Sequence, residues 1–493
     1  MRSRPSLAAA TRATPATVAT PPTSAAPPRA RKTIPIVALS TGLYEAHRKV
    51  YPRSVSGRFN QLRWLMVWVT QVVFYGLPWL PWGERQAVLF DLDARRFYLP
   101  GLVLYPQDLI YLTGLLVVSA LALFLFTAVA GRLWCGYACP QTVYTGIFMW
   151  VEQRIEGSRI ARMRLDGEPF SAEKLVKKWF KHLVWLGIAL WTGFTFVGYF
   201  TPIRELALAF VQTRMGSWEV FWVFFYGFAT YGNAGFMREQ VCKYMCPYAR
   251  FQGAMFDRDT LIVSYDEPRG EPRGLVGKGR PAASRGDCID CGLCVQVCPT
   301  GIDIRQGQQY ECIGCGLCAD ACDTVMQRVK KPPGLVRYAT QNSMAGGWPA
   351  RRIWQHVARP RVLVYAALLA ALSIGLLASL VTRTPLKVDV VRDRGSLAHL
   401  VEGGRLENVY RLQIMNATER AQRYRVAVDG LPGLGVSPSQ DILVEAAASR
   451  WVAVRVQAPH DVAAPGAHAI RMLVQQADGV AQVAEKTTFV VPR

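Results

Sequence analysis

The amino-acid sequence predicts a multi-domain membrane protein: an α-helical bundle of about five transmembrane helices, a cysteine-rich module and a C-terminal all-β immunoglobulin-like sandwich. Separate apolar stretches are long enough to cross a bilayer, all twelve cysteines lie in the middle of the chain, and the last segment alternates like strands. Of the 493 residues, 51% are hydrophobic and 19% charged. That is too apolar for a soluble enzyme and too charged for a chain lying wholly in a membrane.

Five apolar stretches match the thickness of a bilayer, about 30 Å. They are Leu62–Trp82, Leu109–Ala130, His182–Phe200, Trp218–Phe236 and Val362–Val381. Residues 133–151 also lack charge and form either a sixth span or a re-entrant or interfacial helix. A sixth span would place the basic segment 152–181 outside the cell, so the charge pattern favours the re-entrant alternative.

The net charge of +22 orients the bundle. Lysines and arginines gather before the first stretch and after the second and fourth, while the loops after the first and third hold few. Because cytoplasmic loops carry the basic excess, we expect a multi-pass protein of the bacterial inner membrane with a cytoplasmic N-terminus and a periplasmic C-terminal domain. The same pattern explains the charge without nucleic acid, which we do not expect as a partner.

The predicted domains follow from these features. They are a disordered basic tail (1–40), a cytoplasmic lead-in segment (41–61), a membrane domain with four helices (62–260), a cytoplasmic ferredoxin-like domain (261–350), a fifth transmembrane helix (351–384) and a periplasmic immunoglobulin-like domain (385–493). In the last domain, runs such as Tyr410–Ile414 and Trp451–Val456 alternate with period two, and turn residues separate about seven such strands.

The cysteine-rich module contains the pattern C-x-x-C-x-x-C-x-x-x-C twice. The first copy is Cys288, Cys291, Cys294 and Cys298, and the second is Cys312, Cys315, Cys318 and Cys322. In bacterial two-cluster ferredoxins the fourth cysteine of each run binds the other cluster. We therefore expect a di-cluster ferredoxin module with two 4Fe–4S clusters. One is held by Cys288, Cys291, Cys294 and Cys322, and the other by Cys312, Cys315, Cys318 and Cys298.

Structural zinc is the alternative, but zinc sites usually take separated cysteine pairs, with four ligands to each ion. Gly292, Gly314 and Gly316 allow the backbone to pass close to sulfur. The module therefore predicts one-electron transfer and leaves the electron acceptor open.

The remaining four cysteines form a second repeat, Cys135-x-x-x-Cys139-Pro140 and Cys242-x-x-x-Cys246-Pro247, with Gly146 and Gly253 at the same offset. This indicates an internal duplication that creates a site between membrane repeats. If each motif is helical, cysteines at i and i+4 share one face.

Soft thiolates select copper(I), so copper is a candidate substrate or transient ligand of Cys135, Cys139, Cys242 and Cys246. Redox thiol chemistry, cluster ligation and simple packing as small hydrophobic residues are the other interpretations. Met149, Met237 and Met245 lie nearby as thioether ligands or as packing residues.

Together these motifs resemble the cytochrome c oxidase accessory protein family known as FixG, CcoG or RdxA. The resemblance covers almost everything after residue 40, including the Tyr51-Pro52-Arg53 segment, both membrane motifs, the double cysteine run and the sandwich. Asp323 replaces the proline that usually follows the last ferredoxin cysteine.

The resemblance implies maturation of cbb-type cytochrome c oxidase, with an oxidoreductase activity that reduces copper(II) to copper(I). The implied catalytic residues are the four membrane cysteines. The expected partners are the lipid bilayer, a cytoplasmic electron donor, a copper transporter or chaperone and oxidase subunits, and a homodimer is left open. The membrane motifs also resemble NapH/NosR-type proteins, so a quinol-linked electron conduit is an alternative. A non-catalytic oxidase assembly scaffold is another.

Overall fold

The computed structural model describes residues 49–274, 285–393, 398–401, 403–437, 439–479 and 481–492, with the backbone alone for Ala350 and Trp354. The expected tail (1–40) and residues 41–48 of the expected lead-in segment (41–61) lie outside these residues. From Val50 onward the chain forms one compact unit.

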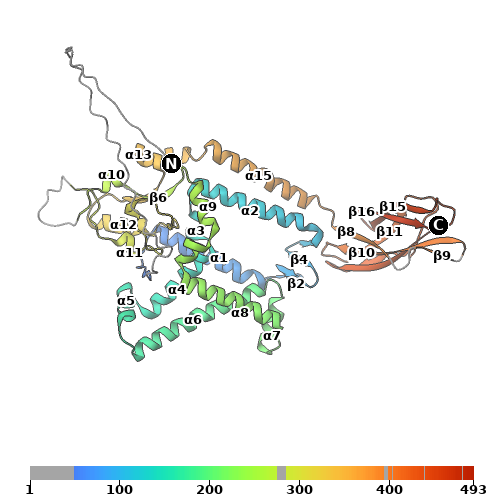
Figure 1. Cartoon of the computed structure of the whole chain (residues 1–493), viewed down its shortest axis with the longest axis horizontal. Helices are drawn as coiled ribbons and strands as arrows, with labels where there is room; N and C mark the ends of the chain where they lie inside the picture. Colours follow the sequence, from blue (N-terminus) through green and yellow to red (C-terminus); the bar gives the residue numbers. More distant parts are fainter. Residues whose placement is uncertain are drawn as a thin grey trace, which may run out of the picture. The chain divides into compact units, whose positions relative to one another are not determined.

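Helices dominate the first half of that unit (Figure 1). The α-helices there are α1 (Arg58–Gly76), α2 (Leu109–Ala130), α3 (Leu133–Tyr137), α4 (Pro140–Glu156), α5 (Arg159–Gly167), α6 (Ala172–Val197), α7 (Ile203–Val211), α8 (Ser217–Tyr231) and α9 (Pro247–Met255). The short 3-10 helix η1 (Leu77–Trp79) follows α1, and η2 (Pro106–Asp108) leads directly into α2. Two π-helices, η3 (Gly232–Met237) and η4 (Val241–Met245), connect α8 to α9.

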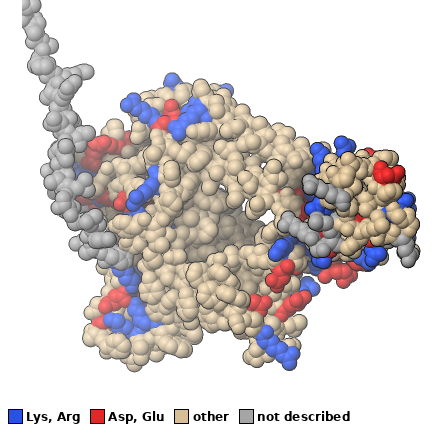
Figure 2. All heavy atoms as spheres, turned by 45° about the vertical axis from the view of Figure 1, so that its right-hand side comes forward, with Lys and Arg blue, Asp and Glu red and all other residues tan. Residues whose placement is uncertain are grey.

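Among the described residues, three helices are long and apolar enough to cross a membrane: Pro106–Ala130, Ala172–Val197 and α15 (Pro360–Val381). The other two predicted spans are not among them, since α1 has 19 residues but is less apolar and α8 has only 15 residues. Helix α1 ends at Gly76 because Pro78 follows, and α8 ends at Tyr231, where the backbone widens into η3. The three long helices indicate membrane association. On one face, uncharged side chains cover the bundle while charged ones gather toward its ends (Figure 2).

Small residues bring the long helices into close contact. A Cβ atom on Gly193 of α6 would lie 2.2 Å from the carbonyl oxygen of Val223 on α8. A Cβ atom on Gly227 of α8 would lie 3.0 Å from the side chain of Leu190. Helices α2 and α15 run side by side (Figure 1), with Gly114 against Leu376. Contacts between small residues allow close backbone packing where no hydrophobic effect drives association.

Residues 133–151 form two helices. Helix α3 has 5 residues, too short to span a bilayer, and α4 begins at Pro140 after an extended Cys139. Phe148 of α4 stacks on Trp185 of α6, with 5.1 Å between ring centroids. This uncharged stretch is therefore a short helix followed by a helix packed inside the bundle.

Opposite ends of α2 contact different domains. At its N-terminal end Asp108 is 2.9 Å from Arg383, just before the C-terminal sandwich. At its C-terminal end the carbonyl oxygen of Val129 accepts a 3.0 Å hydrogen bond from the backbone N–H of Leu261, at the start of the cysteine-rich module. The sandwich and the cysteine-rich module therefore adjoin opposite ends of this helix.

The cysteine-rich module is built on one short antiparallel pair of strands, β6 (Ile262–Tyr265) and β7 (Val336–Ala339). Its helical elements are α10 (Glu267–Gly270), α11 (Leu293–Gln296), η6 (Ile304–Gln306) and α12 (Leu317–Arg328). Helices α13 (Gln341–Gly346) and α14 (Ala350–Gln355) lead to α15. The residues before α11 and α12 are Gly292 and Gly316, with φ of 64° and 72°, a left-handed conformation that glycine adopts without strain.

The C-terminal domain is a two-sheet sandwich, as predicted. Its strands are β8 (Leu386–Arg392), β9 (His399–Val401), β10 (Arg405–Asn416), β11 (Gln422–Asp429), β12 (Gly435–Ser437), β13 (Ile442–Val444), β14 (Ser449–Pro459), β15 (Gly466–Gln476) and β16 (Gln482–Val491). One sheet has the order β12-β14-β10-β8 with β9 beside β10, and the other β13-β11-β15-β16. Tyr410, Leu412 and Phe489 are fully buried between them.

The loop between α1 and α2 contains short strands that the sequence analysis did not predict. They are β1 (Pro81–Trp82), β2 (Arg85–Gln86), β3 (Leu89–Asp91), β4 (Arg96–Leu99) and β5 (Leu102–Leu104). Leu89, Tyr98 and Val103 share a buried cluster with Met415 and Ala447 of the sandwich. The sandwich is thus packed on the membrane domain through this small sheet.

Candidate redox site

Four cysteines of the module line one hollow, which we call the first hollow: Cys288, Cys291, Cys294 and Cys322. Its walls include Leu293, Met326 and Leu335, and Arg305 stands at its edge. Cys291 is exposed, whereas Cys288 and Cys294 are buried. This hollow therefore has one sulfur at the protein surface.

The other four cysteines line the second hollow: Cys298, Cys312, Cys315 and Cys318, with Cys294 at its border. Apolar residues such as Val263, Ile304 and Ile313 complete the wall. Each hollow thus takes three cysteines from one run and its fourth from the other run. This is the arrangement expected from the spacing of the two runs.

The chemistry of these hollows fits iron–sulfur clusters. All twelve cysteines are free thiols. Burial raises the pKa of Cys294 to about 11 and that of Cys322 to about 12, so a thiolate is stable there only beside a compensating cation. Among the described residues, no three His, Cys, Asp or Glu side chains lie close enough to hold a single metal ion. Four thiolates around a cubane are farther apart than four around one zinc ion, so this spacing favours clusters.

The membrane motifs do not form continuous helices, so the expectation that each cysteine pair shares one helix face is wrong. Helix α3 ends at Tyr137, and Cys139 is extended, with φ of −61° and ψ of 128°. In the second motif Cys242 lies in the π-helix η4, and Cys246 is extended before α9. The cause is the following proline, because Pro140 and Pro247 each begin a new helix and exclude the helical conformation from the cysteine before them.

The four membrane cysteines nevertheless lie near one another, in what we call the thiol quartet. Cys135 lies within electrostatic range of Cys242, and Cys139 lies within electrostatic range of Cys246. The two motifs therefore face each other. All four are partly buried. Among the described residues, no three of these thiols lie close enough together to hold one metal ion, so they would have to move to bind one jointly.

The two motifs are related by an approximate internal repeat. Cys135 donates a 3.3 Å hydrogen bond to Gln252, six residues after Cys246. Cys242 shares a small pocket with Thr145, six residues after Cys139. Each first cysteine thus approaches the same position of the other motif's helix, which agrees with the duplication predicted from the sequence.

An arginine supports each motif, and sequence analysis missed both. Arg63 donates a 3.4 Å hydrogen bond to the carbonyl of Thr142, and Arg132 donates one of 2.7 Å to that of Ala249. Thr142 and Ala249 each lie three residues after the second cysteine of a motif. Both arginines are buried, at 7% exposed. The signal in the sequence was the presence of arginines beside uncharged segments, because a buried arginine needs several acceptors.

Helix α3 packs directly on the loop of the second hollow. A Cβ atom on Gly136 would lie 2.9 Å from the carbonyl oxygen of Gly314 and 3.0 Å from Cα of Cys315. Tyr137 donates a 3.2 Å hydrogen bond to the Cys315 carbonyl. Arg132 donates to the carbonyls of Tyr310 and Cys312, the latter at 3.1 Å. The first motif of the thiol quartet is therefore in contact with the second hollow, and Cys135 packs against the cluster of buried residues that contains Cys315.

Met245 is next to Cys246 in the chain, and its side chain is 57% exposed. His182 shares a 2.9 Å hydrogen bond with the hydroxyl of Tyr231 and stacks on Phe236. The contacts of His182 are those of a packing residue.

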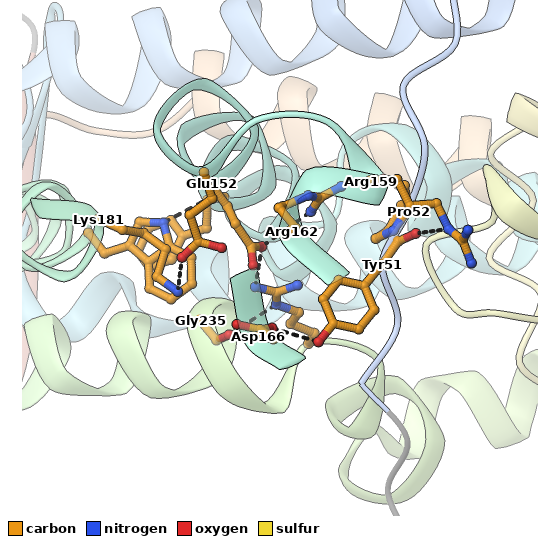
Figure 3. Close-up of polar contacts among 12 residues, drawn as sticks. Tyr51, Pro52, Glu152, Arg159, Arg162, Asp166, Lys181 and Gly235 are labelled. Atoms are coloured by element: carbon orange, nitrogen blue, oxygen red, sulfur yellow. Dashed lines mark hydrogen bonds and ion pairs between the residues drawn. The ribbon is translucent and has the colours of Figure 1, made fainter. Parts of the chain in front are cut away.

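A buried network of charges fastens the helices beside the quartet (Figure 3). Glu152 of α4 is fully buried and lies 2.8 Å from Arg238 and 3.6 Å from Arg162. Glu156 lies 2.9 Å from Lys181 of α6. A buried carboxylate is stable only when paired, so this network fixes α4 against α5, α6 and η3.

Comparison with known families agrees with this architecture. Residues 237–341 match the family described as "4Fe-4S dicluster domain", residues 112–158 one described as "4Fe-4S binding domain", and residues 376–492 one described as "IG-like fold at C-terminal of FixG". The dicluster match contains both hollows together with Cys242 and Cys246, and the 112–158 match contains Cys135 and Cys139.

Known proteins are similar over most of the chain. Protein RdxA of Cereibacter sphaeroides is 40% identical over 434 residues, which cover 85% of this chain and 92% of that protein. The nitrogen fixation protein FixG of Rhizobium meliloti is 39% identical, covering 81% of this chain and 83% of that protein. A crystal structure of a FixG-related protein from Vibrio parahaemolyticus is 24% identical over 22% of this chain and 97% of that one, with a TM-score of 0.20.

Proposed function

Because this chain belongs to the family of FixG and RdxA, an iron–sulfur family of electron-transfer proteins, we propose that it reduces copper(II) to copper(I) at the thiol quartet. The observation that carries the proposal is the contact between α3 and the second hollow, where Gly136 and Tyr137 meet the backbone at Gly314 and Cys315. It leaves no protein layer between the cysteines that would hold a cluster and those that would hold copper.

The cysteines of each hollow would hold one 4Fe–4S cluster, and such clusters supply one-electron transfer. The exposed Cys291 makes the first hollow the side at which a soluble donor approaches. The buried second hollow lies next to the quartet. The residues thus define an order for each electron: donor, first hollow, second hollow, quartet.

Copper fits this acceptor site as a substrate. Each copper(II) ion takes up one electron and becomes copper(I), which prefers soft thiolate ligands. Since Cys139 and Cys246 are extended rather than helical, their thiols are not fixed by a helical backbone. The copper(I) formed would pass to a copper transporter or chaperone and finally to subunits of a cbb-type oxidase.

The proposed orientation follows from the ends of α2. The module with its basic surroundings adjoins the C-terminal end of α2 and would be cytoplasmic, and the sandwich adjoins the N-terminal end and would be periplasmic. In this arrangement α1 and α8 complete a bundle of five helices in the bacterial inner membrane.

The test is copper(II) turnover by the purified protein, with dithionite as electron source and a copper(I)-specific chelator as the detector. We expect the Cys135→Ser/Cys139→Ser/Cys242→Ser/Cys246→Ser variant to keep the iron of both hollows and to lose at least 90% of turnover (roughly 1.4 kcal/mol or more of transition-state stabilisation). Full turnover in this variant would contradict the proposal. Quinol-dependent reduction without any effect of copper would favour an electron conduit instead.

A second candidate is that the quartet itself holds a further iron–sulfur cluster. One observation favours it: the match to the family described as "4Fe-4S binding domain" contains Cys135 and Cys139. Iron analysis separates the two functions. Wild-type protein would then lose about a third of its iron in the fourfold serine variant, whereas copper reduction at the quartet predicts no loss.

A further inference from the structure

A cavity of about 340 Å³ is separate from the hollows and the quartet. It lies between α1, α4 and the segment that precedes α1. Trp64 and Trp150 stand edge to face in its wall, with 6.4 Å between ring centroids. We call it the arginine cavity, after four arginines that line it: Arg53, Arg63, Arg154 and Arg162.

The charge of the cavity is one-sided. Among the described lining residues there are four arginines and no Asp or Glu. Arg63 and Arg162 are 7% and 2% exposed, so they form the floor, while Arg53 and Arg154 are exposed at the mouth. Of the two buried guanidinium groups, Arg162 pairs with Glu152, which does not line the cavity, whereas Arg63 has no carboxylate partner among the described residues. The Arg63 side of the floor therefore favours an anion.

The two floor arginines have hydrogen-bonding capacity left. A guanidinium group carries five N–H donors. In the described part of the chain Arg63 makes one hydrogen bond, the long one to Thr142. Arg162 donates to the carbonyl of Pro52 and pairs with Glu152, and its Nε atom has no partner (Figure 3).

The segment before the cavity offers little negative charge. Residues 1–51 contain eight lysines and arginines and one acid, Glu45. A segment of that composition is repelled by four arginines. A separate anionic molecule is therefore the occupant that fits the described lining best.

The cavity also lies beside the redox centre. Val297, Pro299 and Leu317 line it, and they are chain neighbours of Cys298 and Cys318 in the second hollow. Arg63 lines both the cavity and the small pocket that contains Cys242. A negative charge bound at Arg63 thus lies close to both the second hollow and the thiol quartet.

We propose that the arginine cavity binds the phosphate ester of an anionic ligand, and that its location at the end of α1 makes an anionic phospholipid the source. Bidentate guanidinium–phosphate pairs account for the arginines. The apolar wall and the exposed Leu65 and Trp68 further along α1 provide a path for an acyl chain. Basic pockets between helices on the cytoplasmic side are typical sites for lipid head groups. The proposal does not depend on copper being the substrate.

The experiment uses the full-length protein with its clusters in nanodiscs of phosphatidylcholine alone or with phosphatidylglycerol. Lipid retained by the protein after transfer to detergent is measured by native mass spectrometry. The variant Arg53→Gln/Arg154→Gln removes two charges at the mouth and leaves the floor intact. The matched control, Arg164→Gln/Arg250→Gln, removes two exposed arginines outside the cavity. We expect roughly 30-fold weaker phosphatidylglycerol binding in the first variant and wild-type binding in the second.

A redox titration by electron paramagnetic resonance provides the second readout. A bound phosphate ester makes reduction of the nearby cluster harder, so phosphatidylglycerol lowers one midpoint potential in wild type and in the control, and less in the cavity variant. Adding glycerol 3-phosphate to phosphatidylcholine discs separates the sources: a shift there identifies a soluble phosphate ester and contradicts the lipid source. Equal lipid binding by the two variants, or no binding by wild type, overturns the proposal.

Discussion

The two hollows of the module have the same cysteine spacing but different surroundings. The first has an exposed cysteine and an arginine that pairs with nearby carboxylates, since Arg305 lies 2.7 Å from Asp303. The second is closed by α3, Tyr137 and Arg132, whose contacts go to backbone carbonyls. The contacts of Arg305 with Asp303 stay within one short loop, whereas those of Tyr137 and Arg132 join the module to the membrane helices. This difference indicates that the second hollow is held in a fixed position beside the quartet, while the first hollow is accessible to an electron donor.

The largest effect is expected from removing the arginine that joins the second hollow to the quartet. In Arg132→Gln the carbonyls of Cys312 and Ala249 lose a buried charged donor, at a cost of about 2–4 kcal/mol. We expect copper(II) turnover to fall at least tenfold while iron content is kept. Arg305→Gln at the first hollow is the matched control, with turnover within twofold of wild type. Equal losses in the two variants would mean that the second hollow has no special link to the quartet.

A smaller effect is expected from one added methyl group at each hollow. Gly136→Ala places Cβ 2.9 Å from a backbone oxygen that cannot move aside, which costs about 1–3 kcal/mol and pushes α3 away from the second hollow. Gly292→Ala has its nearest neighbour at 4.0 Å, so only its φ of 64° opposes it, at about 1 kcal/mol. Thermal unfolding and single-turnover reduction of the quartet measure the two costs. A larger loss of reduction rate in Gly292→Ala would reverse the comparison.

The smallest effect concerns acid. Hydrogen bonds from Arg305 hold the pKa of Asp303 below its ordinary value. A carboxyl group whose pKa is lowered on folding adds stability above its unfolded pKa, and that stability is lost as the pH falls toward the folded value. We expect iron release from the first hollow to speed up when the pH falls below about 4. This acceleration over the rate at neutral pH should be slightly larger in wild type than in Asp303→Asn. The rate of iron release against pH, with Asp287 unchanged, is the measurement; identical profiles would exclude this contribution.

The sequence predicted the parts of the fold that depend on local pattern. The period-two runs around Tyr410 and Trp451 became strands β10 and β14, because alternation determines which side chains enter the core. The runs of cysteines likewise indicated which thiols share a hollow. Both patterns are contained in short stretches of chain, so no knowledge of distant contacts was needed.

One failure was local, and the others arose where distant residues decide the conformation. Cys139 and Cys246 leave the helix because of the proline that follows each of them, whereas the one-face expectation assumed a continuous helix. Arg63 and Arg132 meet carbonyls more than 75 residues away, and Glu152 pairs with Arg238 from another helix. Such pairs have no periodic signal in one sequence. For the same reason the strands between α1 and α2 were missed, since their buried side chains pack against residues of the sandwich.

The glycine pair between α6 and α8 has a consequence for how this chain can change over evolutionary time. At position 193 even an alanine side chain would overlap a main-chain oxygen of the neighbouring helix, whereas at the facing position 227 it would meet the end of a leucine side chain at 3.0 Å. A substitution at position 193 must therefore separate two helices that carry none of the redox cysteines. The least substitutable positions of the bilayer region therefore include one without any chemistry of its own.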